Sequence, residues 1–139
     1  MLRNTADHLA AIDEIERLLR HAGIGYWIFG GWAVDFHAGA ITRSHADIDF
    51  AVWATDRARL DARLEDQSWT HTPEPGEDGY TCYLRAGVRV EVAFLARGED
   101  GRVYTPLHEG QGDWPDDTFG DDVLELNGVG ARVIARAGR

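Results

Sequence analysis

Apolar residues recur at three- and four-residue spacing near the start of the chain, which predicts an amphipathic helix over residues 5–21. The positions that carry this pattern are Leu9, Ile12, Ile15, Leu18 and Leu19. Asn4 or Thr5 is a candidate N-cap, and Gly23 follows the last apolar position as a helix terminator. We expect this helix to be scaffold.

A short, continuous apolar run follows and predicts a buried strand over Tyr26–Phe29. It runs into Gly30 and Gly31, after which Trp32–Ala38 is expected to form a short helix that Gly39 ends. A glycine pair between a strand and a helix lets backbone N–H groups approach a phosphate, because no side chain stands in the way. A simple tight turn is the alternative interpretation of the same pair.

The next predicted strand, residues 47–53, carries two carboxylates on one face. Its apolar residues alternate with polar ones, so Asp47 and Asp49 point the same way, about 6–7 Å apart along the strand. Arg43 and His45 would share that face if the strand began earlier. Two adjacent carboxylates repel each other unless a cation lies between them, and hard oxygen ligands are those that Mg²⁺ prefers. The pair therefore predicts a magnesium site.

The rest of the pattern alternates short elements with polar turns. A helix of about ten residues is expected after Thr55 or Asp56. Further strands are expected at Tyr80–Arg85, Val88–Leu95, Arg102–Thr105, Val123–Leu126 and Ala131–Ile134. The second of these contains a third carboxylate, Glu91, for which a solvated sheet face is the simpler interpretation when it is taken alone.

Between the last predicted strands lies a long acidic, glycine-rich stretch, residues 107–122, which we expect to be a loop. Trp114 within it is the tryptophan best placed to stack on an adenine or an acceptor ring, whereas Trp27, Trp32 and Trp53 are expected in or near the core. The acidic residues of this loop are candidates to bind ammonium groups of a cationic acceptor: Glu109, Asp113, Asp116 and Asp117. A solvated loop explains them equally well.

Composition narrows the classes of protein. A chain of 139 residues fits one domain, 1–139. No apolar run approaches the roughly 20 residues that span a membrane, and the N-terminus lacks the apolar core of a signal peptide, so we expect a cytoplasmic protein. The net charge of −10 argues against broad binding to nucleic acid. All fourteen basic residues are arginines, which excludes a lysine-based mechanism. The single cysteine, Cys82, is expected to be a small core residue.

Taken together, these motifs resemble a known family. The order of a glycine pair after a buried strand, a strand with two carboxylates and a third carboxylate on a later strand is that of the polymerase-β-like nucleotidyltransferase superfamily. The sequence is most similar to its lincosamide and aminoglycoside nucleotidyltransferases. The residues that carry this resemblance are Gly30-Gly31-Trp32-Ala33-Val34-Asp35, Gly39, Thr42-Arg43-Ser44-His45-Ala46-Asp47-Ile48-Asp49 and Val90-Glu91-Val92.

The resemblance implies an α+β nucleotidyltransferase fold, with a mixed β-sheet and helices packed mainly on one face. It also implies an adenylyltransferase that moves AMP, or another nucleoside monophosphate, from ATP or another nucleoside triphosphate to a hydroxyl of a small molecule. Aminoglycoside or lincosamide antibiotics are the candidate acceptors, which would make the protein an antibiotic-resistance factor. Asp47, Asp49 and Glu91 are then the catalytic residues and the ligands of one or two Mg²⁺ ions.

Other residues of the motif are assigned to the nucleotide. Gly30 and Gly31 are expected to cradle the leaving phosphates. Arg43 is expected to be a bidentate phosphate partner, with an ion pair to an aspartate as the alternative. His45 is expected to touch phosphate or to orient a carboxylate. Asp35 is expected to have a structural role, as a turn cap or a hydrogen-bond partner of Arg43 or His45, with a nucleotide contact as the alternative.

Relatives of this kind usually continue past the closing strand into helices that help to form the acceptor pocket, whereas this sequence ends at Arg139. We therefore expect either a minimal enzyme or an acceptor site that a second subunit completes, as in a homodimer. One rival function is that of the minimal nucleotidyltransferases of toxin–antitoxin systems, which modify a protein or RNA. A second is nucleotide binding without catalysis, against which the retention of all three carboxylates argues.

Overall fold

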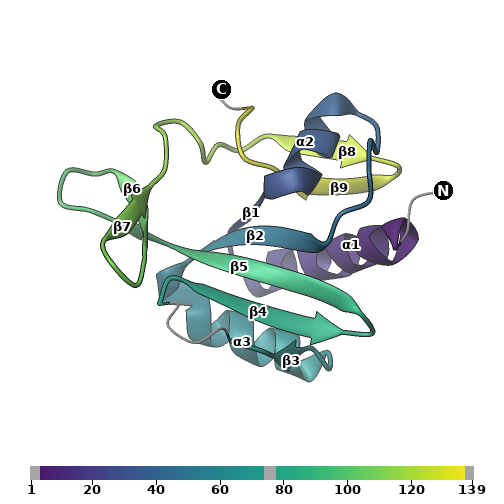
Figure 1. The fold of residues 1–139 in the computed structure, drawn as a ribbon, viewed down its shortest axis with the longest axis horizontal. Helices are drawn as coiled ribbons and strands as arrows, with labels where there is room; N and C mark the ends of the chain where they lie inside the picture. The colour runs from purple at the N-terminus through teal and green to yellow at the C-terminus, as the bar shows by residue number, and fades with distance from the viewer. Residues whose placement is uncertain (1–3, 74–77, 137–139) are drawn as a thin grey trace.

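The computed structural model describes residues 4–73 and 78–136, and within them helices and strands alternate along most of the chain (Figure 1). The helical elements are α1 (Thr5–Ala22), α2 (Gly30–Ala38), the 3₁₀ turn η1 (Ala54–Asp56) and α3 (Arg57–Asp66). The first five strands are β1 (Tyr26–Phe29), β2 (Asp47–Trp53), β3 (Thr70–His71), β4 (Tyr80–Arg85) and β5 (Val88–Arg97). The last four are β6 (Val103–Pro106), β7 (Gln111–Asp113), β8 (Val123–Leu126) and β9 (Val129–Arg132).

The main sheet is mixed. Its strand order is β1-β2-β5-β4-β3, and β6 and β7 continue from the far end of β5. The central pair, β2 and β5, is parallel, whereas the other pairs in the sheet are antiparallel. The helices and this mixed sheet form the α+β fold that the sequence predicted.

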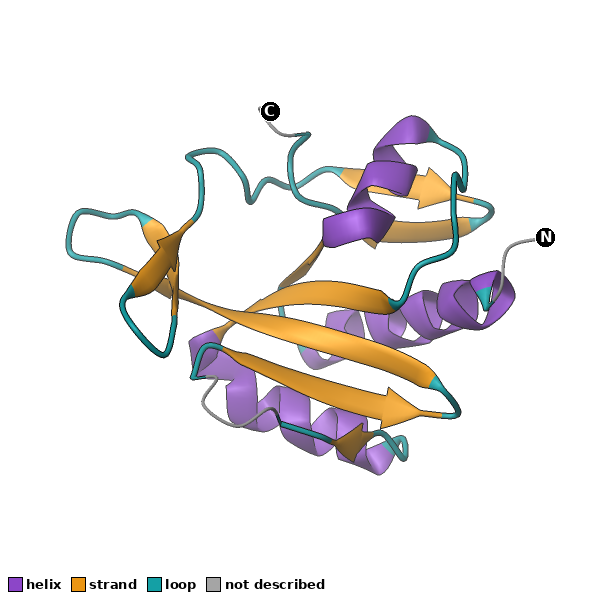
Figure 2. Ribbon diagram, in the orientation of Figure 1, coloured by secondary structure: helices purple, strands orange, loops and turns teal. Residues whose placement is uncertain are grey.

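The two faces of the sheet differ because side chains alternate along each strand. One face buries Ile48, Phe50 and Val52 of β2 in the main core, together with apolar residues of β5 and of α1, α2 and α3. Figure 2 shows α1 and α3 behind the sheet and α2 beside the β8–β9 hairpin. All three helices therefore contribute to the core on one face, as expected. The opposite face carries the carboxylates and a second, smaller apolar cluster around Ala51 and Leu95.

The β8–β9 hairpin is tied to the edge strand β1. Ile28 forms a bridge with Val133, and the Ile134 N–H donates to the Ile28 carbonyl at 3.0 Å. The Trp27 indole N–H donates to the Gly120 carbonyl at 2.7 Å, which fixes the segment before β8. These bonds place the end of the described chain next to the strand that leads into α2.

Several predicted elements are confirmed and some boundaries change. The helix predicted over 5–21 is α1, with Gly23 in the left-handed conformation at its end, but neither Asn4 nor Thr5 caps its start through a side chain. The predicted hairpin of Tyr80–Arg85 and Val88–Leu95 is present, and β5 runs two residues further, to Arg97. Within the described residues, no helix is long and apolar enough to cross a membrane.

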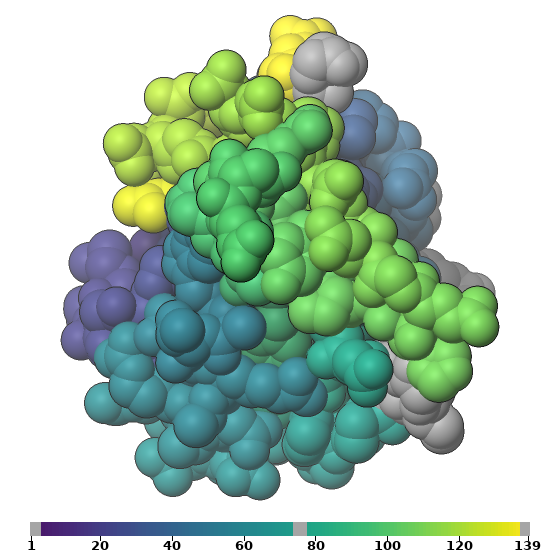
Figure 3. Space-filling view, turned by 90° about the vertical axis from the view of Figure 1, so that its left-hand side faces the viewer, coloured from purple at the N-terminus to yellow at the C-terminus, as the bar shows by residue number. Residues whose placement is uncertain are grey.

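Two short strands were not predicted. Thr70–His71 pairs with β4 as β3, and Gln111–Asp113 pairs with β6 as β7, inside the stretch predicted to be a loop. The sequence Gln-Gly-Asp has no alternating pattern, so only its neighbouring strand makes it extended. Figure 3 shows the residues of β6, β7 and the following segment, in green and yellow-green, over the end of the sheet at which β5 leaves it.

Candidate active site

Three carboxylates lie on the sheet face opposite the main core. Asp47 and Asp49 alternate with the buried Ile48 along β2, and Glu91 of β5 is the direct register partner of Asp49. All three are partly exposed. The parallel pairing of β2 and β5 thus brings the predicted third carboxylate beside the first two.

Asp49 is the most strongly perturbed member of this group. Burial makes the largest contribution to raising its pKa, and the negative charges of Glu91 and Asp47 raise it further. The Arg89 guanidinium lowers the pKa in part, and the net result is a pKa of about 7. A carboxylate that is both desolvated and surrounded by like charges gains most from a nearby cation. The electrostatics of the face therefore favour a bound cation.

Gly30 closes one side of Asp49. Helix α2 begins at Gly30 itself, two residues earlier than predicted, and Gly30 has a φ of 72°. A Cβ at this position would overlap the Asp49 carboxylate. Glycine therefore allows both the left-handed backbone and the close approach of the carboxylate to the N-terminal turn of the helix.

Gly31 likewise allows the side chains of Arg43 and His45 to approach the helix closely. A Cβ on Gly31 would lie 2.6 Å from the Arg43 Nη2 atom and 2.6 Å from the His45 Nδ1 atom. The structure thus gathers Gly31, Arg43 and His45 at the start of α2. Arg43 and His45 lie in the turn before β2, which begins only at Asp47. The suggestion that Arg43 and His45 extend the strand face is therefore wrong.

His45 is buried and its ring is held by Asp35. The His45 Nε2 atom lies 2.6 Å from the Asp35 Oδ2 atom, and the ring stacks at a tilt on Trp32, with 4.5 Å between centroids. Thr42 donates to the same carboxylate from its hydroxyl at 2.6 Å and from its N–H at 3.2 Å. Burial raises the pKa of Asp35, but the bonds from Thr42 and His45 outweigh it and leave the pKa below its usual value.

This network ties the turn before β2 to α2. Trp32 continues it, because its indole N–H donates to the His8 Nδ1 atom of α1 at 3.0 Å. The Asp35–His45 contact was one of the structural roles considered for Asp35. The link through Trp32 to His8 was missed, since nothing in the local pattern joins α1 to residue 45.

Arg89 is a site residue that sequence reasoning also missed. It is the register partner of Asp47 and lies two residues before Glu91 on the same face. Its Nε atom lies 3.4 Å from the Asp47 Oδ1 atom and its Nη2 atom 4.0 Å from the Glu91 Oε2 atom. Arg89 and Glu91 are two residues apart in a predicted strand, so their side chains point to the same face, and this spacing could have placed Arg89 on the acidic face.

Trp114 is anchored to the protein instead of standing free in a loop. Its ring lies edge-on to Phe29, with 5.3 Å between centroids, and to Phe119 at 5.2 Å, and its indole N–H donates to the Thr105 hydroxyl at 2.9 Å. Phe29 is the register partner of Asp49. Trp114 also lines a hollow of about 380 Å³ beyond the carboxylates. Stacking of its ring on an adenine or an acceptor stays a prediction.

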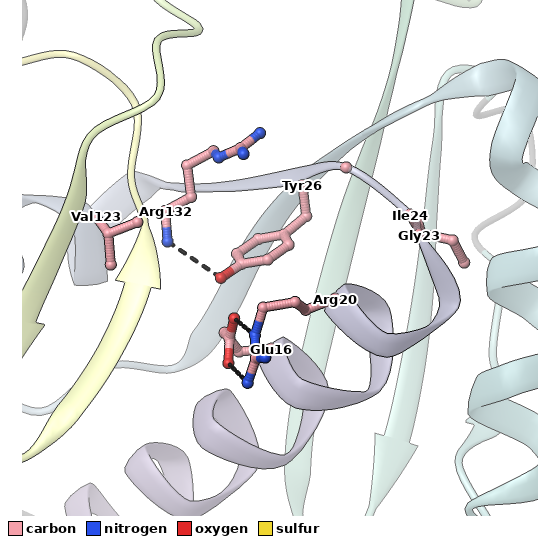
Figure 4. Close-up of a pocket in the computed structure, with 8 residues that line it drawn as sticks. Glu16, Arg20, Gly23, Ile24, Tyr26, Val123 and Arg132 are labelled. Carbon is pink, nitrogen blue, oxygen red and sulfur yellow. Dashed lines mark hydrogen bonds and ion pairs between the residues drawn. The ribbon is translucent and has the colours of Figure 1, made fainter.

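Another hollow, of about 280 Å³, lies where α1 ends and β1 begins (Figure 4). Arg20 and Glu16 on its wall pair with each other at 3.0 Å, and the Tyr26 hydroxyl accepts the Arg132 backbone N–H at 3.1 Å. The site carboxylates are not among the residues that line it. This hollow is therefore separate from the candidate active site.

The geometry agrees with a comparison of the whole sequence with known families. The sequence model of the aminoglycoside-2''-adenylyltransferase family matches residues 11–137, which include every site residue described above except His8. The chain belongs to the aminoglycoside-2''-adenylyltransferase family.

Relatives of this family share both sequence and fold with the chain. A 2''-aminoglycoside nucleotidyltransferase of Klebsiella pneumoniae is 40% identical over 57 residues, which cover 41% of this chain and 28% of the relative. The matched segment therefore spans less than a third of that protein.

Two solved structures have the same fold. The lincosamide antibiotic adenylyltransferase LnuA, bound to lincomycin, superposes with a TM-score of 0.71 at 22% identity, over 88% of this chain and 77% of the other. ANT(2'')-Ia in complex with adenylyl-2''-tobramycin superposes with a TM-score of 0.74 at 19% identity, over 93% and 70% of the two chains. At these identities the likeness establishes the nucleotidyltransferase fold.

The donor set on the acidic face suits a hard divalent cation. Carboxylate oxygens are the ligands that Mg²⁺ prefers, and a cation would relieve the repulsion that Glu91 and Asp47 exert on Asp49. Within residues 4–73 and 78–136, however, no three His, Cys, Asp or Glu side chains are already arranged to hold a metal ion. The three carboxylates would therefore have to turn toward a common point to bind one.

Proposed function

We propose that this protein is a magnesium-dependent nucleotidyltransferase that transfers AMP from ATP to a hydroxyl group of an aminoglycoside antibiotic. The observation that supports this most directly is the pairing of Asp49 with Glu91 across β2 and β5, beside the Gly30 backbone at the start of α2. Carboxylates for a cation and N–H groups for phosphates then face the same place.

Each residue has a role in this proposal. Asp47, Asp49 and Glu91 would hold one or two Mg²⁺ ions, which would lower the pKa of the attacking hydroxyl and neutralise the phosphates. The N–H groups at the start of α2 would bind the departing phosphates, since Gly30 and Gly31 add no side chain of their own there.

The turn before β2 would supply a phosphate ligand. Arg43 is exposed and its guanidinium lies beside Gly31, so it would donate to the same phosphates. His45 would act as a positioning residue, because its Nε2 atom is engaged with Asp35 and its ring packs on Trp32.

The transfer step is a displacement at phosphorus. The acceptor hydroxyl oxygen forms a bond to the α-phosphorus of ATP, and the bond from that phosphorus to the bridging oxygen of pyrophosphate breaks. The hydroxyl proton passes to Glu91 or to another carboxylate of the face, for which a raised carboxyl pKa of the kind seen at Asp49 is suitable.

The proposed acceptor class is supported by the family and by what relatives of the same fold bind. One relative of the same fold is bound to lincomycin and another to adenylyl-2''-tobramycin. An acceptor with several ammonium groups also suits a chain with a net charge of −10. An ATP-dependent reaction of this kind fits the cytoplasmic location expected from the sequence, which stays a prediction.

The test is a transfer assay read by mass spectrometry. The protein is incubated with ATP and Mg²⁺ and with each member of a panel that contains tobramycin, kanamycin, gentamicin and lincomycin. A mass gain of one AMP on an aminoglycoside, with matching release of pyrophosphate, is the expected result. Asp47→Asn and Glu91→Gln should abolish it, whereas the exposed Asp121→Asn should not.

Other outcomes would redirect the proposal. Transfer to lincomycin alone would keep the chemistry and replace the acceptor. Transfer to none of the panel, with ATP bound, would contradict the small-molecule acceptor and favour a protein or RNA acceptor or a non-catalytic module. Light scattering on the same samples tests the homodimer expected from the sequence.

A further inference from the structure

Arg89 contacts the two carboxylates that flank Asp49 on the acidic face. Its Nε atom lies 3.4 Å from the Asp47 Oδ1 atom, and its Nη2 atom lies 4.0 Å from the Glu91 Oε2 atom. From these contacts we propose that Arg89 is a built-in counter-cation, which competes with the divalent cation for Asp47 and Glu91. This inference rests on the metal site of the proposed function.

The position of the guanidinium is fixed by the sheet. Arg89 pairs in register with Asp47 of β2 on one side and with Leu84 of β4 on the other. Its Nη2 atom also donates to the buried Cys82 sulfur at 3.0 Å. The side chain is therefore held across the acidic face by groups on three strands, β2, β4 and β5.

The contacts are partly shielded from water. The side chains of Arg89, Asp47 and Glu91 are 37%, 34% and 29% exposed. Charges at this depth interact more strongly than those of a fully exposed surface pair, whose contribution is close to zero. The guanidinium therefore relieves repulsion among the carboxylates while no metal is bound, in line with its lowering of the Asp49 pKa.

The same contacts stand in the way of a divalent cation. Magnesium binds carboxylate oxygens at about 2.0–2.1 Å, so it would draw on the same two carboxylates that Arg89 contacts. A divalent cation would also repel the arginine at such short range. Because the same two carboxylates would serve both the guanidinium and the metal, each cation would weaken the binding of the other.

Two arginine variants and a matched control test this competition without any acceptor. Arg89→Gln removes the charge and Arg89→Lys keeps it. Arg59→Gln removes a guanidinium of α3 that pairs with Asp56 of η1 at 2.6 Å. Helix α3 packs on the main core, on the face of the sheet opposite the carboxylates. Calorimetry measures the Kd for Mn²⁺ in the absence of nucleotide, and thermal unfolding is followed in EDTA and in Mg²⁺.

The expected result is at least about fivefold tighter Mn²⁺ binding by Arg89→Gln, the lower end of ordinary coupling between two ligands, with Arg89→Lys in between. Arg89→Gln should also have a lower Tm than the wild type in EDTA and a larger rise in Tm on addition of Mg²⁺. Arg59→Gln should bind Mn²⁺ as the wild type does.

Equal or weaker Mn²⁺ binding by folded Arg89→Gln would overturn the inference, and so would a wild type and variant that both bind no metal. If Arg89→Gln does not fold, Arg89→Lys decides alone: it should bind Mn²⁺ more tightly than the wild type, and equal or weaker binding would overturn the inference. Failure to find an acceptor would contradict the proposed function. It would not affect this inference, which depends only on the Kd of Mn²⁺ for Arg89→Gln relative to the wild type.

Discussion

Replacing Asp49 with asparagine should stabilise the metal-free protein while it abolishes its activity. Asp49 is partly buried and faces the charges of Glu91 and Asp47, so its ionised form is costly when no cation is bound. Asparagine has nearly the same shape, carries no charge and can donate a hydrogen bond to Glu91. Such a result would mean that the carboxylate cluster lowers the stability of the metal-free protein, which is common where function requires like charges to be held together.

The pKa of Asp49 sets the size and the pH range of this effect. A raised folded-state pKa means that the folded protein holds the proton more tightly than the unfolded chain does. The wild type therefore loses stability as pH rises from about 4, the pKa of an unfolded aspartate, to the folded-state pKa of about 7, and no more beyond it. The full shift corresponds to at most about 4 kcal/mol, and partial exposure to water reduces it to about 1–3 kcal/mol.

Urea unfolding followed by tryptophan fluorescence at pH 4.5 and pH 8, both in EDTA, measures this difference. Asp49→Asn should exceed the wild type by about 1–3 kcal/mol at pH 8 and by much less at pH 4.5. Added Mg²⁺ should stabilise the wild type at pH 8 and leave Asp49→Asn unchanged, because binding to the folded state alone raises its stability. The exposed Asp121→Asn serves as control.

The reasoning would be refuted if Asp49→Asn were no more stable than the wild type at pH 8. It would equally be refuted if the difference between the two proteins did not change with pH.

Three further predictions concern the surroundings of the carboxylates. Gly30→Ala should cost at least about 2 kcal/mol of stability, while Gly39→Ala, with a similar φ of 73° but open space around it, should cost about 1 kcal/mol, as urea unfolding can show. Asp35→Ala should lower stability by about 3 kcal/mol, because the hydrogen-bond donors of Thr42 and the buried His45 lose their acceptor; unchanged stability would contradict the structural role. Trp114→Ala should cost about 2 kcal/mol through lost ring contacts, and if it weakens ATP binding without that loss the ring serves the ligand instead.

Much of the site was encoded in local sequence. The alternation over β2 was enough to place Asp47 and Asp49 on one face and Ile48 in the core, because the strand period of two is a property of the backbone alone. The two glycines that begin α2 were recognisable for the same reason, since a glycine pair between a strand and a helix is a local arrangement. The resemblance to the family then gave the fold, which the structure confirms.

Which strand lies beside β2 was decided only by the tertiary structure. Parallel pairing with β5 sets Glu91 against Asp49 and Arg89 against Asp47, across about 40 residues of chain. Local alternation fixes the face on which a residue lies but says nothing about its neighbour on the next strand. The same limit applies to Gln111–Asp113, which became a strand only because β6 was there to pair with it.

The sequence therefore determined the chemical groups and the faces on which they lie, and packing determined which groups meet. The requirement for glycine at residue 30 is the clearest case. The motif alone suggested a phosphate cradle, but the carboxylate that leaves no room for a Cβ belongs to Asp49, nineteen residues further along the chain. Contacts of this kind depend on the global arrangement of the strands, because the hydrophobic core positions whole elements and only then do their polar faces come together.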